Sequence, residues 1–211
     1  MNINDYEKKY FPIYDDFAGT VRFILEKALL AAKNLPVPQS VQCRAKGIES
    51  LRRRLSEAGK LDTQTLEIDR RDLAGARLIF YTNNDVDCFL ASPLIRDNFD
   101  IEEDSTKIHH PTPENKGARY RAIHYTVRLR EDRIRLPEYS IFAGLRCEIQ
   151  VQTILNHAWS ETSHDILYKD KLGDGYGGKA MKGIAHRFER IMDKYLIRSK
   201  RWAIPFMAFP P

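Results

Sequence analysis

The chain has 211 residues, of which 43% are hydrophobic and 30% are charged, so it can form one or two globular domains with a buried core. It has no apolar run of about 18 residues, which excludes a membrane-spanning helix, and its start has no signal-peptide pattern. Its three cysteines lack CxxC spacing, so we expect a reduced cytoplasmic protein without disulfides or a zinc site. Its net charge of +5 is a mild excess, which would suit a phosphate-bearing partner.

The first third of the chain predicts two helices and one strand. Residues 15–33 carry apolar side chains at helical spacing after two aspartates, which a helix dipole favours at its start. Residues 40–46 follow a proline-containing loop and are expected to form a short strand. Residues 46–59 predict a helix that ends at Gly59, and residues 61–71 read as a polar connection.

The rest of the chain predicts further strands and helices, separated by loops rich in proline or glycine. The expected strands are residues 75–82, 120–130 and 145–153, with a weaker one at 100–108. The expected helices are residues 83–99, bent or ended by Pro93, and residues 154–169 and 179–200. The expected loops are residues 109–118 and 170–178.

These elements predict a mixed α/β (α+β) fold, in which a sheet of four or five strands is flanked by helices. Because no internal linker is present, one domain over residues 1–211 is the simplest count. The tail, residues 199–211, is aromatic and proline-rich and fits no element. It reads either as a partner-binding tail or as the cut end of a longer protein.

A basic segment follows the first strand. Lys46, Ser50 and Arg54 are spaced i, i+4 and i+8, so they share one face of the expected helix, and Arg44 lies just ahead of it. Donors gathered at a helix N-terminus form a cradle for phosphate. On this segment alone, a solvated basic face is the simpler interpretation.

Two carboxylates and an arginine occupy strand positions. Arg77 lies within an apolar strand and needs a partner, either Asp72 or a phosphate, because an unpaired buried charge is costly. The period of two places Glu148, Gln150 and Gln152 on one face of their strand, and one wet face would explain them. Yet Asp72 and Glu148, on neighbouring strands, could hold Mg²⁺ bridged to phosphate oxygens.

Aromatic and titratable side chains mark two further segments. Tyr120 and His124 share a strand face, with Arg121 on the other, and a tyrosine beside arginines suits stacking on a base. For this tyrosine alone, ordinary sheet packing is the simpler interpretation. His157 and Glu161 belong to a polar stripe that lacks HExxH spacing, so we expect it to face solvent or a cleft, not a metal.

Four segments together resemble a known family. RAKGIESLRRRL, RDLAGARLIF, YRAIHYTV and EIQVQTILNHAWSETSHDILYK occur in the order and at the spacings of the RelA/SpoT synthetase domain, over residues 15–198. The resemblance implies a nucleotidyltransferase-like mixed sheet flanked by helices. It also implies transfer of the β,γ-pyrophosphate of ATP to the 3′-hydroxyl of GDP or GTP with Mg²⁺, which produces the stringent-response alarmone (p)ppGpp.

The resemblance also implies a role for each candidate residue. The ATP phosphates would be held by Arg44, Lys46, Ser50 and Arg54, with help from Arg77. Asp72 would bind Mg²⁺, and Glu148 would assist the metal or take the proton from the attacking hydroxyl. The acceptor would contact Tyr120, which stacks on its base, and also His124, Gln150, Arg121 and Lys116.

The acceptor loop departs from the pattern of guanosine-specific members, Lys-Pro-x-x-Gly-Tyr-Arg-Ser-Leu-His. Here Ala118 and Arg119 separate the glycine from the tyrosine, and Gln152 replaces the usual arginine before threonine. Residues 157–169 look more like toxic relatives that modify adenosine nucleotides or the 3′ end of tRNA. The open alternatives are therefore such a toxin-like enzyme, with an antitoxin partner, and a non-catalytic nucleotide- or RNA-binding module. Homo-oligomer formation also stays open.

Overall fold

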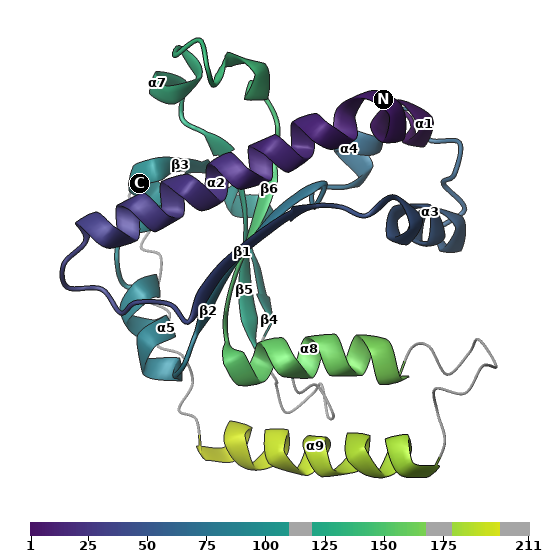
Figure 1. Ribbon diagram of the computed structural model, residues 1–211, viewed down its shortest axis with the longest axis vertical. Helices are drawn as coiled ribbons and strands as arrows, with labels where there is room; N and C mark the ends of the chain where they lie inside the picture. The colour runs from purple at the N-terminus through teal and green to yellow at the C-terminus, as the bar shows by residue number, and fades with distance from the viewer. Residues whose placement is uncertain (110–119, 168–178, 199–211) are drawn as a thin grey trace.

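A computed structural model describes residues 1–109, 120–167 and 179–198 (Figure 1). Within these ranges, six strands form one sheet with the order β1-β2-β6-β5-β3, while β4 also pairs with β5. The strands are β1 (Ser40–Ala45), β2 (Ala74–Phe80), β3 (Phe99–Ile101), β4 (Lys107–His109), β5 (Ala122–Leu129) and β6 (Cys147–Thr153). β2 and β6 are parallel, and the other pairs are antiparallel. The expected mixed sheet is confirmed.

The long helix α2 (Phe11–Ala31) crosses the sheet (Figure 1). It begins four residues before the expected helix, because α1 (Ile3–Asp5), capped by Asn2, and the π-helix η1 (Tyr6–Tyr10) lead directly into it. Its buried side chains include Phe17, Val21 and Leu25. They join the main core together with Leu78 of β2 and Ile149 of β6, so this face of the sheet is closed to ligands.

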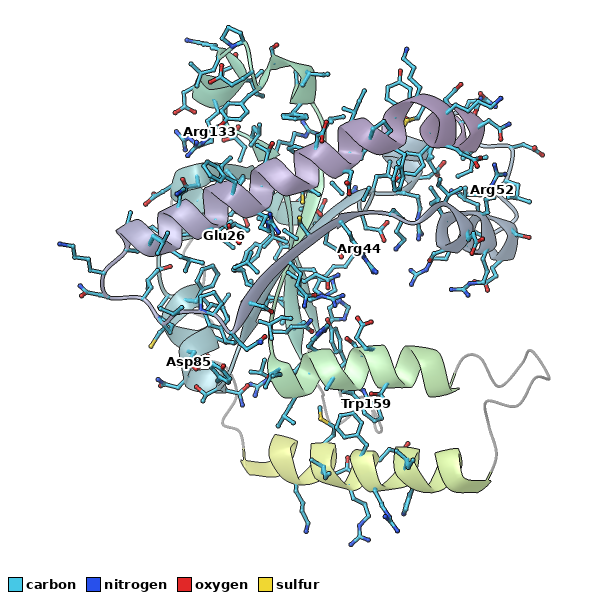
Figure 2. The ribbon with its side chains drawn as sticks, viewed as in Figure 1. Glu26, Arg44, Arg52, Asp85, Arg133 and Trp159 are labelled. Carbon is cyan, nitrogen blue, oxygen red and sulfur yellow. The ribbon has the colours of Figure 1, made fainter. Side chains whose placement is uncertain are left out.

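The carboxyl ends of β2 and β6 are covered by α8 (Ile154–Leu167), with α9 (Lys179–Arg198) alongside it (Figure 1). Figure 2 shows Trp159 between these two helices, and its ring centroid lies 5.6 Å from that of Phe188. Ile79, Ala122 and Met192 are buried apart from the main core. We infer that α8 and α9 close this end of the second sheet face.

Several boundaries differ from the expected ones. The segment 100–108 holds parts of two strands, β3 and β4, separated by η2 (Glu103–Ser105), which is why the sheet has more than five strands. The segment 83–99 divides at Pro93 into α5 (Asn83–Leu90) and α6 (Leu94–Asn98). The added short helices are α4 (Leu66–Asp69) within the expected polar connection, α7 (Glu131–Ile134) and η3 (Ser140–Phe142).

The helix α3 (Ile48–Glu57) confirms the expected stop. Gly59 has φ 65°, a left-handed conformation that glycine adopts freely, and Lys60 N donates to Leu55 O at 2.8 Å. Residues 110–118, the turn 170–178 and the tail 199–211 lie outside the described residues. In the described part of the chain, no helix is long and apolar enough to cross a membrane.

Candidate active site

The open face of the sheet is the floor of a cleft of about 780 Å³, a volume typical of ligand sites. The parallel register sets Gly75 beside Glu148 and Arg77 beside Gln150, and the antiparallel register sets His124 on the other side of Gln150. A Cβ added to Gly75 would lie 3.8 Å from the Arg44 carbonyl oxygen, an ordinary contact, so backbone packing there does not require glycine.

Ten predicted site residues meet in this cleft. They are Arg44, Lys46, Ser50, Arg54, Asp72, Arg77, Tyr120, His124, Glu148 and Gln150. Arg121 is not among the lining residues. Arg121 is fully buried, and its backbone N–H donates to Asn156 Oδ1 at 3.1 Å. Burial raises the pKa of Asp87, and the positive charge of Arg121 partly offsets this increase. Lys116 lies outside the described residues.

Four side chains at the β1–α3 junction form what we call the basic wall of the cleft: Arg44, Lys46, Ser50 and Arg54. Arg44 extends from β1 toward the space between α3 and α8 (Figure 2), while Ser50 and Arg54 come from α3. Among the described residues, eight lysines and arginines line the cleft against four carboxylates. The basic wall is therefore part of a concave site, and the excess positive charge of the whole cleft attracts polyanions. Arg52, in contrast, points elsewhere and pairs with Glu7.

Asp72 is held by the basic wall. Lys46 Nζ donates to Asp72 Oδ2 at 2.6 Å, and Arg70 Nε lies 3.6 Å from Asp72 Oδ1. The alternative in which Asp72 neutralises Arg77 is therefore wrong for this structure. Asp72 precedes β2, whereas the Arg77 side chain extends along the sheet toward α8.

Arg77 is paired with the polar stripe of α8. Its Nε donates to Gln150 Oε1 at 3.0 Å, and its Nη1 donates to Glu161 Oε1 at 2.9 Å. The same Nη1 lies 3.0 Å from His157 Nδ1. Burial and the Arg77 charge lower the pKa of His157, so a neutral ring can accept this hydrogen bond. The stripe therefore faces the cleft, one of its two expected positions.

Glu148 stays ionised although it is largely buried. Gln150 Nε2 donates to Glu148 Oε1 at 2.7 Å, and His124 Nδ1 lies 3.4 Å from the same oxygen. Burial alone would raise the pKa of Glu148. Burial is outweighed by the hydrogen bond and charge of His124, by the Gln150 hydrogen bond and by the charge of Lys107. Together they lower the pKa of Glu148 to about 2.

The donor set fits a magnesium ion. Mg²⁺ takes oxygen ligands and is usually bound by one or two carboxylates together with substrate phosphates. Asp72 and Glu148 line the same cleft, and the basic wall beside Asp72 would hold the phosphates. The carboxylates would thus complete a site that phosphate oxygens share.

Gln152 lies on the same strand face as Glu148 and Gln150, but the expectation of a wet face is wrong at this position. Its side chain is fully buried, and neither amide atom has a hydrogen-bond partner among the described residues. Gln152 is buried because α8 begins directly after β6 and covers the carboxyl end of this strand. Only the half of the strand that carries Glu148 and Gln150 opens into the cleft.

Some cleft residues were not among the candidate site residues taken from the sequence. They are Arg53, Asp69, Arg70, Arg71, Lys107, His109 and Ser160. The pair Arg70–Arg71 directly before Asp72 was a usable signal, and so was the alternation of Lys107 and His109 about Ile108. The expectation that His109 begins a loop is wrong, because it pairs with Ala122 as the last residue of β4.

Asn156 ties the start of α8 to Arg121, in the segment that carries Tyr120 and leads into β5. It is fully buried, its Nδ2 donates to Thr153 Oγ1 at 2.9 Å, and its Oδ1 accepts from the Arg121 backbone. We expect Asn156→Ala to lower the free energy of unfolding by about 1–3 kcal/mol, because the Arg121 backbone N–H and the Thr153 hydroxyl each lose a buried hydrogen bond. Urea denaturation measures this, with Asn84→Ala on an exposed helix position as the control. Equal stabilities would contradict the role.

The fold and the cleft define a class of protein: a mixed-sheet domain with an open cleft that is lined by a basic wall and two carboxylates, Asp72 and Glu148. A family model described as the region found in RelA / SpoT proteins matches residues 43–173, and the chain belongs to this family. Among curated protein sequences, none matches the chain.

Solved structures share the fold. Small alarmone synthetase 1 from Bacillus subtilis, bound to its product pppGpp, is 17% identical and has a TM-score of 0.66, covering 92% of this chain and 94% of that chain. The same protein bound to AMPCPP gives 15% identity and a TM-score of 0.63, with coverages of 92% and 93%. A GTP pyrophosphokinase family protein from Streptococcus pneumoniae gives 23% identity and a TM-score of 0.63, with coverages of 92% and 89%.

Proposed function

We propose that the chain is an ATP-dependent pyrophosphokinase that transfers the β,γ-pyrophosphate of ATP to the 3′-hydroxyl of GDP or GTP and so makes (p)ppGpp. The observation that carries this proposal is the cleft itself, where a basic wall, two carboxylates and Tyr120 meet. Membership of the RelA/SpoT family supports it. Small alarmone synthetase 1 from Bacillus subtilis, which shares the fold, binds the product pppGpp and AMPCPP, and this also supports the proposal.

The donor side would act by positioning and by charge. Arg44, Lys46, Ser50 and Arg54 would hold the ATP phosphates, and Arg77 would exchange its contact with exposed Glu161 for a phosphoryl oxygen. The acceptor oxygen forms a bond to the β-phosphorus and its hydroxyl proton is released to solvent. The bond from this phosphorus to the oxygen shared with the α-phosphate breaks, releasing AMP. Fixed positive groups stabilise the charge that develops on the phosphoryl oxygens.

Mg²⁺, when bound by Asp72 and Glu148, would add positive charge at the same oxygens. Glu148 would also accept a hydrogen bond from the acceptor hydroxyl. With a pKa of about 2, its carboxylate is ionised at neutral pH, which favours the roles of cation ligand and hydrogen-bond acceptor.

The acceptor side would be formed by Tyr120, His124 and Gln150. The Tyr120 hydroxyl lies 3.1 Å from His124 Nε2, and burial raises the pKa of Tyr120, so its ring stays neutral and available for stacking. The two residues inserted between Gly117 and Tyr120 favour a second candidate, a toxin-like enzyme whose acceptor is an adenosine nucleotide or the 3′ end of tRNA. An antitoxin partner, a homo-oligomer and a cytoplasmic location are part of these proposals.

One assay separates the candidates. The protein is incubated with Mg²⁺, ATP labelled at its γ-phosphate, and GDP, GTP, ADP, unlabelled ATP or tRNA in turn, and the products are resolved by chromatography. We expect label to enter GDP or GTP. Label in tRNA or an adenosine nucleotide would overturn the guanosine acceptor but keep the chemistry. Binding of ATP without transfer to any acceptor would instead support the non-catalytic module.

A further inference from the structure

The short edge strand β4 adds a side chain to the acceptor side of the cleft. Its antiparallel register sets His109 opposite Ala122 and Lys107 opposite His124. Directly opposed residues share a sheet face, so His109 and Lys107 lie on the open face, and both line the cleft. Ile108 lies on the other face of the strand.

His109 completes a cluster of three rings. Its centroid lies 4.4 Å from that of His124 and 5.4 Å from that of Tyr120, with interplanar angles of 53° and 56°. The Tyr120 and His124 rings are 6.0 Å apart and nearly perpendicular, at 75°. Tilted rings of this kind make a wall, on which the flat face of a nucleobase can stack.

The polar atoms of the three rings differ in whether they contact another polar group. The Tyr120 hydroxyl and His124 Nε2 contact each other, and His124 Nδ1 faces Glu148. His109 Nε2 is buried and has no hydrogen-bond partner in the described part of the chain. A buried nitrogen without a hydrogen-bond partner is unfavourable. A ligand that supplies the missing partner therefore binds more tightly than one that does not.

His109 is also suited to a neutral ligand edge. Burial, followed by the charges of His124 and Lys107, lowers the pKa of His109, and the charge of Glu148 only partly opposes them. A neutral imidazole offers one donor and one acceptor. Bases differ in the donors and acceptors along their edges, so such a group can prefer one base over another.

We propose that His109 determines acceptor specificity: its ring completes the base-binding wall with Tyr120, and a ring nitrogen hydrogen-bonds to the edge of the acceptor base. This inference rests on the proposed function to the extent that the acceptor is a nucleotide. It assigns to β4 a role in choosing the base.

Equilibrium binding tests this role without relying on turnover. Fluorescently labelled GDP and ADP are titrated onto the full chain with Mg²⁺ and saturating AMPCPP, which fills the donor site. His109→Phe keeps a ring but removes both nitrogens, and we expect it to weaken the preferred nucleotide by about tenfold and to reduce the preference between the two. His109→Ala, which also removes the ring, should weaken both nucleotides. Ile108→Ala, on the opposite face of the same strand, should bind as the wild type.

Wild-type affinities and preference in both His109 variants would overturn the inference. So would a parallel loss of AMPCPP binding, measured by titration calorimetry, because it would show a general effect on the cleft. If the wild type transfers pyrophosphate while the His109 variants bind normally, only the role of His109 fails. If the variants change nucleotide preference but the wild type transfers nothing, only the proposed reaction fails.

Discussion

Replacing Asp72 by asparagine is expected to slow pyrophosphate transfer by about 100- to 1,000-fold, the size of effect seen when one charge-stabilising group is removed from an active site. Asparagine keeps the shape of the side chain but removes the negative charge. The cleft then loses a carboxylate ligand for Mg²⁺, and the Lys46 ammonium loses its partner at 2.6 Å. Lys46 would also be less well positioned to meet the phosphates of ATP.

The same substitution should leave the fold intact. The Asp72 side chain is 24% exposed, and partly solvated ion pairs contribute little to stability, about 1 kcal/mol or less. Transfer from labelled ATP measures the loss, and urea denaturation measures stability. Glu7→Gln, which removes a carboxylate paired with Arg52 outside the cleft, serves as the control and should keep wild-type transfer. Wild-type transfer by Asp72→Asn would show that this cleft is not the site.

Much of the candidate site could be predicted because its signals are local. The period of two in a strand is enough to place Glu148 and Gln150 on one face, and the helical period is enough to align Lys46, Ser50 and Arg54. These placements depend on residues within a few positions of each other. They can therefore be predicted without knowing which elements pack together in the fold. All five residues line the cleft.

The remaining features depend on contacts between distant segments. Arg77 meets Glu161, which is 84 residues away, and nothing near either residue indicates that α8 returns across β2. Gln152 follows the same alternation as Gln150, yet it is buried because a helix covers that end of the strand. His109 enters the cleft only because β4 pairs with β5. Local periodicity predicts which face a side chain takes but not what covers that face.

Replacing Glu148 by glutamine should also remove transfer, again by about 100- to 1,000-fold, and should change how stability depends on pH. Glutamine keeps the length of the side chain but cannot balance the charges of His124 and Lys107 or serve as an anionic ligand for Mg²⁺. The Glu148 side chain is only 15% exposed, so these charges act across a poorly solvated region.

The pH dependence follows from the lowered pKa of Glu148, about 2 in the folded chain against about 4.3 in an unfolded one. A carboxyl group with a depressed folded pKa stabilises the fold above the unfolded pKa and loses that contribution as pH falls toward the folded value. The wild type should therefore lose up to about 3 kcal/mol more unfolding free energy than Glu148→Gln between pH 5 and 2. Urea denaturation at stepped pH measures the difference.

Glu103→Gln provides the matched control for Glu148→Gln, because Glu103 pairs with Arg96 and does not line the cleft. It should keep both wild-type transfer and the acid sensitivity that Glu148 contributes. Loss of transfer in Glu148→Gln with an unchanged pH dependence would place the carboxylate in the reaction but contradict its lowered pKa. An unchanged rate with a flatter pH dependence would make Glu148 a structural partner of His124 and Gln150, and the catalytic assignment would then be wrong.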